Sequence, residues 1–281
     1  MADKQQTPAA APATGTDTDT TAAERKKEVQ AYFGATAQNY VASVRHASGW
    51  DLHRLVELCE CAPDAEALDI ATGGGHTALH VAPHVRSVVA SDLTPDMLAA
   101  AEAHILSKGM TNVTFVVADA EALPFADASF DIVTCRIAPH HFTNVAAFCS
   151  EVARVLRPGG RFVMIDSWVA EDAELDHFIN HIEWRRDTTH GRSLRLSEWS
   201  ALIEGTGLAI DVIEPFERRH EFAGWTTTSR MADDARDELD AYIAAASPKV
   251  HAHFDIRLAD GKTESFVDHK FLVRARKPLS K

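Results

Sequence analysis

The pattern of apolar and polar positions changes character several times along the chain. Between about Glu66 and Asp166, short apolar runs that predict strands alternate with longer segments that carry apolar residues at helical spacing. The predicted strands are 67–71, 85–92, 113–119, 131–137 and 161–166. Apolar strands that alternate with helices indicate a parallel sheet with helices on both faces. We therefore expect an α/β fold for this part of the chain.

The segments before this alternation carry two other patterns. Residues 1–23 are dominated by Ala, Thr, Pro, Asp and Gly, with no large apolar side chain beyond Met1, so we expect a disordered tail. The folded domain is then 24–281. Apolar residues at helical spacing predict one helix from Val29 to Val44 and a second from Trp50 to about Glu60.

After Trp168 the chain returns to helical spacing with much charge and histidine. The predicted elements are helices at 171–188, 197–205 and 226–246 and a strand at 208–216. The last segment, from 251 to about 276, predicts a hairpin that turns at Asp260-Gly261. His251 and His253 alternate on its first strand, and we expect them to face solvent.

Composition narrows the class of function. The chain has 28 Lys and Arg against 41 Asp and Glu, a formal charge of −13, which does not favour a nucleic-acid partner. No run of about 18 apolar residues predicts a membrane helix, and the first residues lack the pattern of a signal peptide. The four cysteines are too few and too irregularly spaced for a disulfide scaffold. We expect a cytoplasmic protein that acts on a small molecule; a homodimer stays open.

Three features lie where ligands bind in an open α/β sheet, at the carboxyl ends of the strands. The first strand runs into Gly73-Gly74-Gly75, where the backbone can turn tightly and approach a ligand. Asp92 ends the second strand, where a carboxylate can accept hydrogen bonds from ribose hydroxyls. Asp119 ends the third, where it can accept from the adenine amine. The glycine turn alone also fits a dinucleotide fingerprint, so an NAD-dependent oxidoreductase is the alternative.

Five segments in this order resemble the motifs of class I S-adenosylmethionine-dependent methyltransferases, and the closest group is similar to the quinone-biosynthesis-type small-molecule enzymes. The segments are LDIATGGGHTA, SDLTPDML, ADAEALPF, SFDIVTCR and RVLRPGGRFVMID. The resemblance implies a Rossmann-like fold with a mostly parallel seven-stranded sheet, an antiparallel C-terminal strand and a helical lid. It places the cofactor-binding core at 66–167 and the lid at 24–60 and 169–200. The cofactor it implies is S-adenosylmethionine.

The resemblance also assigns roles to residues at the strand ends. Asp69, Gly73 and Gly75 are expected to line the methionine end of the cofactor, and Asp92 to hold its ribose. The other expected cofactor contacts are Leu93 on the adenine ring, Asp119 and Ala120 at the adenine edge, Arg136 beside the transferable methyl group, and Tyr40 as a candidate for closing over the site. Ala71 stands where the family usually has glycine, and it fits only if its φ stays negative.

Histidines supply the candidate catalytic groups. His140 and His141 directly follow the fourth strand, and one of them could be the general base that takes a proton from the methyl acceptor. The competing interpretation is a structural loop. Arg136 could bind a carboxylate or form a structural ion pair. His177 and His181 have a spacing that can chelate a metal, but no third ligand is evident, so we expect a solvated helix face and no metal site.

These observations predict transfer of a methyl group from S-adenosylmethionine to a small, apolar or aromatic acceptor. The alternatives are the NAD-dependent oxidoreductase and a non-catalytic module that binds a nucleoside. Asp119 and the Arg157-Pro158-Gly159-Gly160 turn have no place in a dehydrogenase.

Overall fold

The structure, a computed structural model, describes residues 21–42, 49–229 and 231–279, without the side chains of 38–40 and 42. It confirms the α/β fold. Seven strands form the main sheet, in which β9 is antiparallel to both of its neighbours and every other pair is parallel. In spatial order they are β3 (Val113–Val117), β2 (Ser87–Asp92), β1 (Glu66–Ile70), β4 (Phe130–Arg136), β5 (Leu156–Val169), β9 (Lys262–Arg276) and β7 (Ala209–Glu221). Two short strands, β6 (Leu194–Arg195) and β8 (Arg257–Ala259), pair with β5 and β9.

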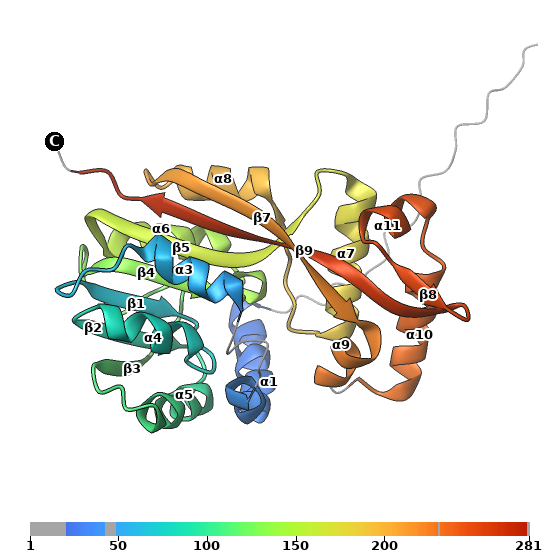
Figure 1. Ribbon diagram of the computed structural model, residues 1–281, viewed down its shortest axis with the longest axis horizontal. Coiled ribbons are helices and arrows are strands. Elements are labelled where there is room, and N and C mark those ends of the chain that lie inside the picture. Colours follow the sequence, from blue (N-terminus) through green and yellow to red (C-terminus); the bar gives the residue numbers. More distant parts are fainter. Residues whose placement is uncertain (1–20, 43–48, 230, 280–281) are drawn as a thin grey trace, which may run out of the picture.

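Helices cover both faces of this sheet because alternate residues of its strands point to opposite sides. On β4, Ile132 packs into the core beneath one set of helices, and its neighbour Val133 packs into the core on the other face. The first set is α3 (Trp50–Cys59), α4 (His76–Val81) and α5 (Pro95–Ser107); the second is α6 (Val145–Val155) and α8 (Leu196–Glu204) (Figure 1). Two single turns, η1 (Ala82–His84) and η2 (Pro139–His141), follow α4 and β4.

Beyond the sheet, a second body of helices forms what we call the helical lobe. It comprises α7 (Ala173–Arg186), α9 (Phe222–Thr228), α10 (Asp233–Ala244), α11 (Pro248–His253) and β8 (Figure 1). It has its own apolar core, which includes Phe178 of α7, Trp225 of α9 and Phe266 of β9. The long strands β7 and β9 run from the main sheet into it (Figure 1).

This arrangement bears on the lid that the sequence predicts at 24–60 and 169–200. Within those ranges α1 and α7 line the cavities described below, whereas α3 and α8 pack on the main sheet, and the lobe also draws on 222–256. Helical spacing shows that one face of a helix is buried but does not show against which neighbour, so a lid over the site stays a prediction.

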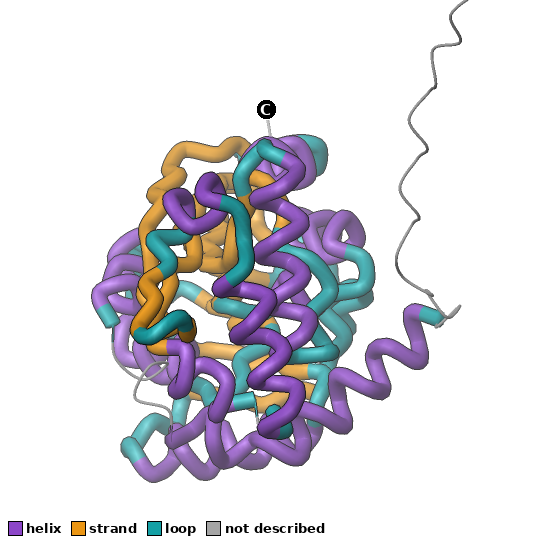
Figure 2. The backbone as a smooth tube through the Cα atoms, turned by 90° about the vertical axis from the view of Figure 1, so that its right-hand side faces the viewer, coloured by secondary structure: helices purple, strands orange, loops and turns teal. Residues whose placement is uncertain are grey.

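The first helix, α1 (Ala22–Ala42), packs on α5 through Ala37, Met97 and Ala100. Thr21 and Glu24 hydrogen-bond to each other at its start in the pattern of a capping box. The helix therefore begins before the expected boundary at 24; the rest of the expected tail, residues 1–20, lies outside the described part. Figure 2 shows that the N-terminal end of α1 projects away from the rest of the molecule.

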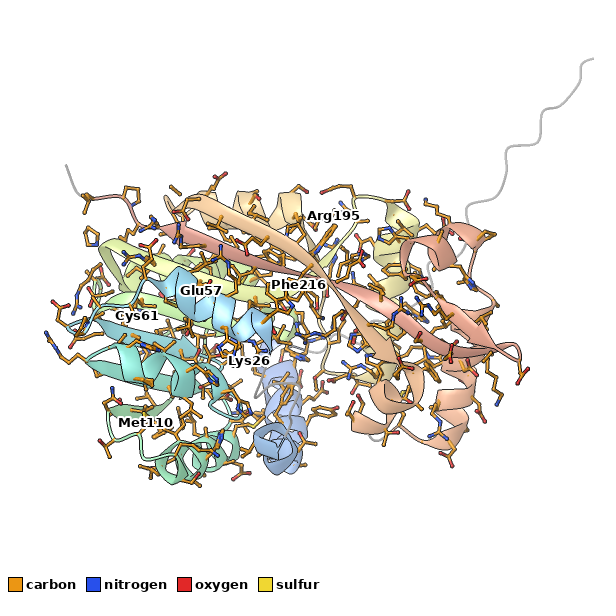
Figure 3. All side chains as sticks on the ribbon, in the orientation of Figure 1. Lys26, Glu57, Cys61, Met110, Arg195 and Phe216 are labelled. Carbon is orange, nitrogen blue, oxygen red and sulfur yellow. The ribbon has the colours of Figure 1, made fainter. Side chains whose placement is uncertain are left out.

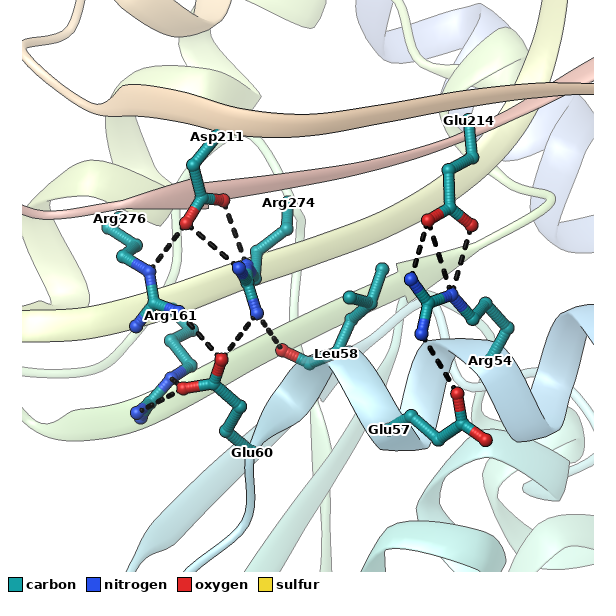
Figure 4. A network of polar contacts seen from close by, with 9 residues as sticks. All are labelled: Arg54, Glu57, Leu58, Glu60, Arg161, Asp211, Glu214, Arg274 and Arg276. Carbon is teal, nitrogen blue, oxygen red and sulfur yellow. Dashed lines mark hydrogen bonds and ion pairs between the residues drawn. The ribbon is translucent and has the colours of Figure 1, made fainter.

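A cluster of ion pairs joins α3 to the two C-terminal strands (Figure 4). Arg54 of α3 makes a two-pronged contact with Glu214 of β7, at 2.6 Å for the shortest N–O distance. Next to it, Glu60 accepts from Arg161, Arg274 and Arg276. Such partly exposed pairs stabilise the fold only modestly, but they fix the place of α3 on the sheet.

Two sequence predictions near the C-terminus are wrong. The single helix expected at 226–246 is two helices, α9 and α10. The strand expected to carry His251 and His253 is instead α11, and the ring of His253 packs 4.7 Å from that of His269 and is only partly exposed. A signal for this helix was present, since Ser247 caps it and Pro248 occupies its first turn. The turn at Asp260-Gly261 is confirmed by the pairing of β8 with β9.

None of the helices in the described ranges is both long and apolar enough to span a membrane.

Candidate active site

The carboxyl ends of β1, β2, β3, β4 and β5 meet along one edge of the sheet, and the turns that follow them form the candidate site. After β1 the backbone turns through Ala71, Gly73 and Gly75, all with positive φ, of 52°, 54° and 78°. The positive φ of Ala71 contradicts the expectation that alanine fits only with a negative one. Ala71 is held in a conformation that costs an L-residue about 1–2 kcal/mol, and the surrounding turn must compensate for it.

The two glycines of this turn with positive φ, Gly73 and Gly75, serve different purposes. Gly73 lines the cavity described below, and a Cβ there would meet no atom within 4 Å. A Cβ on Gly75 would lie 2.8 Å from Cδ1 of Ile105 on α5, so Gly75 allows the turn to pack against that helix. Gly75 does not line the cavity.

Asp69 lies behind the turn and is almost completely buried. Its carboxylate accepts hydrogen bonds from the hydroxyls of Thr72, at 2.6 Å, and Thr134, at 2.7 Å. Burial raises the pKa of Asp69 to about 6, although these two hydroxyls oppose the rise. In this structure Asp69 organises the turn and does not line the cavity.

Asp92 lines the cavity at the end of β2. Its two oxygens accept from the backbone N–H of Gly73, at 3.0 Å, and of Thr94, at 2.9 Å. Burial raises the pKa of Asp92, and these hydrogen bonds counteract it. Each carboxylate oxygen can accept more than one hydrogen bond, so the group can also accept from a ligand.

Asp119, at the end of β3, is paired with a residue that the sequence analysis did not single out. Lys26 of α1, labelled in Figure 3, lies 2.7 Å from Oδ2 of Asp119 and 2.6 Å from Glu121. Burial opposes the charge on Lys26, but these two carboxylates raise its pKa overall. The pairs hold α1 across the end of β3.

Arg136, at the end of β4, is in a buried ion pair with Asp51 of α3. Its Nη2 lies 2.8 Å from Oδ2 of Asp51, and Nη2 of Arg218 lies 3.3 Å from the same oxygen. Burial alone would raise the pKa of Asp51, but the two guanidinium groups lower it. The structural ion pair that the sequence left open is thus present; Arg136 also lines the cavity, and its binding of a ligand carboxylate stays a prediction.

His140 is tied to Asp166, the buried carboxylate within β5. Nδ1 of His140 lies 2.6 Å from Oδ1 of Asp166, and the backbone N–H of His140 donates to Oδ2 at 2.9 Å. Burial lowers the pKa of His140 well below its usual value, and burial raises the pKa of Asp166 to about 6. A neutral imidazole that donates Nδ1–H to the carboxylate leaves Nε2 as an acceptor.

His141 is held differently. Its Nδ1 lies 3.1 Å from the carbonyl oxygen of Thr189, and its ring contacts Phe33 of α1 edge-on, with centroids 5.0 Å apart. No carboxylate among the described residues contacts this imidazole.

These groups surround two adjoining cavities. The first has a volume of about 120 Å³ and lies over the turn after β1. Of the expected cofactor residues, it brings together Ala71, Gly73, Asp92, Leu93, Asp119, Ala120 and Arg136. Tyr40 lies in α1, but its side chain is outside the described part.

The second cavity, of about 420 Å³, lies between the sheet and the helical lobe. Phe33, Ile137 and His141 line both cavities, so the two adjoin there, and His140 lines only the second. Ile137 has a positive φ of 55°, which is rare for a β-branched residue and marks strain at this junction.

Several lining residues were missed by the sequence analysis. Lys26, Phe33 and Met97 lie on helices, where each reads as an ordinary surface or core position. The lobe residues that line the second cavity come from three distant segments, and no local signal links them. Among the described residues, no group of three or more His, Cys, Asp or Glu could hold a metal ion; His177 and His181 stack on one another on α7.

Comparison with known proteins agrees with this geometry. A family model described as a methyltransferase domain matches residues 68–164. The chain is 36% identical to the uncharacterised methyltransferase YcgJ of Bacillus subtilis over 87% of this chain and 97% of that protein. The crystal structure of a candidate methyltransferase from Bacillus halodurans matches with a TM-score of 0.80 and 39% identity, over 82% of this chain and all of the other.

A UbiE-type ubiquinone/menaquinone C-methyltransferase of Ectopseudomonas mendocina is 34% identical over 53% of this chain and 61% of its own length. The fold and site define a Rossmann-like methyltransferase. The chain belongs to the class I S-adenosylmethionine-dependent methyltransferases, and its similarity to YcgJ extends over nearly the whole of that protein.

Proposed function

We propose that this protein binds S-adenosylmethionine in the first cavity and transfers its methyl group to a small molecule held in the second. The observation that carries the proposal is the adjacency of the two cavities at Ile137 and His141. A ligand in each would meet there, and methyl transfer requires such alignment of donor and acceptor. We also propose that the protein works in the cytoplasm, without a nucleic-acid partner.

The residues of the first cavity fit this cofactor. The carboxylate of Asp92 can accept from the two ribose hydroxyls while it keeps its backbone hydrogen bonds. Leu93 and Met97 offer apolar surface for a purine ring, and Asp119 stands where it can accept from the adenine amine. Gly73 leaves space beside the backbone for close approach of the methionine part. When bound, the cofactor supplies a methyl group on a positively charged sulfur.

The second cavity and His140 would then act on the acceptor. We propose that Nε2 of His140 removes the proton from the acceptor atom as that atom forms its bond to the methyl carbon. The carbon–sulfur bond breaks with its electron pair on sulfur, so the products are S-adenosylhomocysteine, the methylated acceptor and an imidazolium paired with Asp166. The contact of His140 with Asp166 supports His140 over His141, because among the described residues His141 has no carboxylate that would stabilise an imidazolium.

The first test is binding, which needs no acceptor. Titration calorimetry with S-adenosylmethionine, S-adenosylhomocysteine and NAD is expected to show binding of the first two and none of NAD. Binding of NAD alone would favour the oxidoreductase. Turnover is then followed as release of S-adenosylhomocysteine with a panel of small acceptors. Tight cofactor binding with no turnover across a broad panel would favour the non-catalytic binding module.

A further inference from the structure

The second cavity carries more charge than an apolar acceptor requires. Six charged side chains line it: Glu183, Arg186, Asp187, Arg218, Asp268 and Lys270. Charged groups are costly to bury unless they are paired or meet a polar ligand, so this lining favours a polar group on the small, apolar or aromatic acceptor that the sequence predicts. The partners of each group indicate what the acceptor carries.

The carboxylates of the cavity already have close partners. Oε2 of Glu183 accepts from Nε and Nη2 of Arg186, at 3.0 and 2.8 Å. Oδ1 of Asp187 accepts from the backbone N–H and the hydroxyl of Thr189. Oδ2 of Asp268 lies 2.6 Å from Nζ of Lys270 and 3.0 Å from Nε2 of His220, within ion-pair distance, although neither oxygen of Asp268 accepts a hydrogen bond with good geometry from a described residue.

Two cations of the cavity have N–H donors with fewer acceptors. Lys270 is 6% exposed and has three N–H groups, of which two meet Oγ of Ser167 and Oδ2 of Asp268. In the described part of the chain, the third has no acceptor.

Arg218 is the less satisfied of the two. Its one ion pair with a described residue is the 3.3 Å contact to Asp51, and Arg136 lies closer to that same carboxylate, at 2.8 Å. The carboxylate of Asp51 is therefore shared between two guanidinium groups. Among the described residues, Asp51 is the one acceptor that Arg218 contacts with its side chain, so several of its five N–H donors can face a ligand or water.

We propose that the second cavity recognises a methyl acceptor that carries an oxyanion, a carboxylate or phosphate, which Arg218 and Lys270 bind. Arg218 and Lys270 are then specificity residues, and a guanidinium and an ammonium together suit an anionic oxygen group. The acceptor also presents a protonated nucleophile to His140. This inference rests on the proposed function, because it assigns the acceptor of that reaction.

The test uses pairs of small hydroxy acids and their primary amides, which have nearly the same shape but differ in charge and in one hydrogen-bonding group. Each compound is added to the full chain with S-adenosylhomocysteine, and the melting temperature is measured; turnover with S-adenosylmethionine is measured in parallel. We expect acids, and inorganic phosphate at higher concentration, to stabilise the protein more than amides do. Among acceptors that are turned over, kcat/KM should be at least about 10-fold higher for the acid.

Variants assign the effect to the cavity. Arg218→Gln should reduce the preference for acid over amide about 10-fold or more, with unchanged binding of S-adenosylhomocysteine. Arg218→Lys should retain most of the preference for acid over amide. Arg219→Gln is the matched control, because Arg219 is the next residue of β7 and pairs with Asp255 outside the cavity.

The results separate the two proposals. If S-adenosylhomocysteine stabilises the protein but no acid does so more than its amide, the oxyanion site is wrong and the methyltransferase proposal stands. The oxyanion site is equally wrong if Arg218→Gln leaves the preference for acid over amide unchanged. If S-adenosylhomocysteine itself does not bind, the proposed function fails first.

Discussion

Asp166 accepts two hydrogen bonds from a single residue, His140: Oδ1 lies 2.6 Å from Nδ1 of the ring and Oδ2 lies 2.9 Å from the backbone nitrogen. The carboxylate therefore fixes both the position of the loop after β4 and the orientation of the imidazole. Asn cannot replace it, because an amide offers one acceptor oxygen where two are needed.

This pair predicts a specific pH dependence. The dyad gains a proton as pH falls through about 6, the pKa to which burial raises Asp166, so the rate should fall below that pH. Asp166→Asn should lower the plateau of kcat at least about 10-fold and move the acid limb to lower pH, since loss of a neighbouring negative charge lowers the pKa of His140 further. An acid limb in the same place for both proteins would contradict the role of Asp166.

Removal of the His140 imidazole should lower the rate of methyl transfer without changing cofactor affinity. We expect His140→Ala to lower kcat about 10²–10⁴-fold while calorimetry shows unchanged affinity for S-adenosylmethionine. His141→Ala should reduce the rate much less, and His177→Ala, an exposed position on α7, should have no effect. Near-parent rates for His140→Ala would make the histidine structural and leave alignment as the source of catalysis.

Cofactor affinity should depend on the carboxylate of Asp92. Asp92→Asn presents one oxygen and one NH₂ group to Gly73, Thr94 and the ribose, so at least one charge-assisted hydrogen bond is lost. We expect the Kd for S-adenosylmethionine to rise about 10-fold or more by calorimetry. Asp96→Asn, the same change on an exposed carboxylate four residues later, is the control. Equal affinities in two folded proteins would remove Asp92 from the site.

The backbone strain at Ala71 can be measured as the change in stability when glycine replaces this alanine. Ala71→Gly removes the Cβ that opposes a φ of 52°, while glycine makes the unfolded chain more flexible, so we expect a net stabilisation of about 0.5–1 kcal/mol in denaturant unfolding. Ala128, exposed and also at φ 52°, is a control outside the site: Ala128→Gly should stabilise similarly and leave cofactor affinity unchanged. A destabilised Ala71→Gly protein would show that the Cβ makes contacts worth more than the strain.

The ion pairs of Lys26 should control entry to the first cavity. At about 120 Å³, this cavity is below the roughly 300–1,000 Å³ typical of pockets for drug-sized ligands, so we predict that α1 moves outward when the cofactor enters. Lys26→Gln weakens the hold on Asp119 and Glu121. We expect association and dissociation rates of S-adenosylmethionine to rise about 2–5-fold in stopped-flow experiments. Lys27→Gln, on the exposed side of α1, should alter neither rate.

The sequence by itself determined the parts of this protein whose signals are local. Strand–helix alternation, the glycine turn and the acids at strand ends predicted the cofactor half, because at those positions the chain's own spacing places residues at one edge of the sheet. The hairpin turn at Asp260-Gly261 was also predictable, because its signal lies in two adjacent residues. The sign of φ at Ala71 was not, since it depends on the packing of the whole turn.

Only the tertiary structure decided which groups work together at the second cavity. Arg218 and Lys270, which line this cavity, and Asp166, which holds His140 from behind, lie on three strands that are far apart in the chain. In the sequence, each of the three has the pattern of an ordinary strand residue. Periodicity identifies a buried face but not the neighbour that buries it, so the helical lobe, the Asp51 pair and the partner of His140 all depended on contacts distant in sequence. Most of the first cavity is lined by short runs of residues that directly follow strands, whereas the second cavity forms only once β5, β7 and β9 have paired.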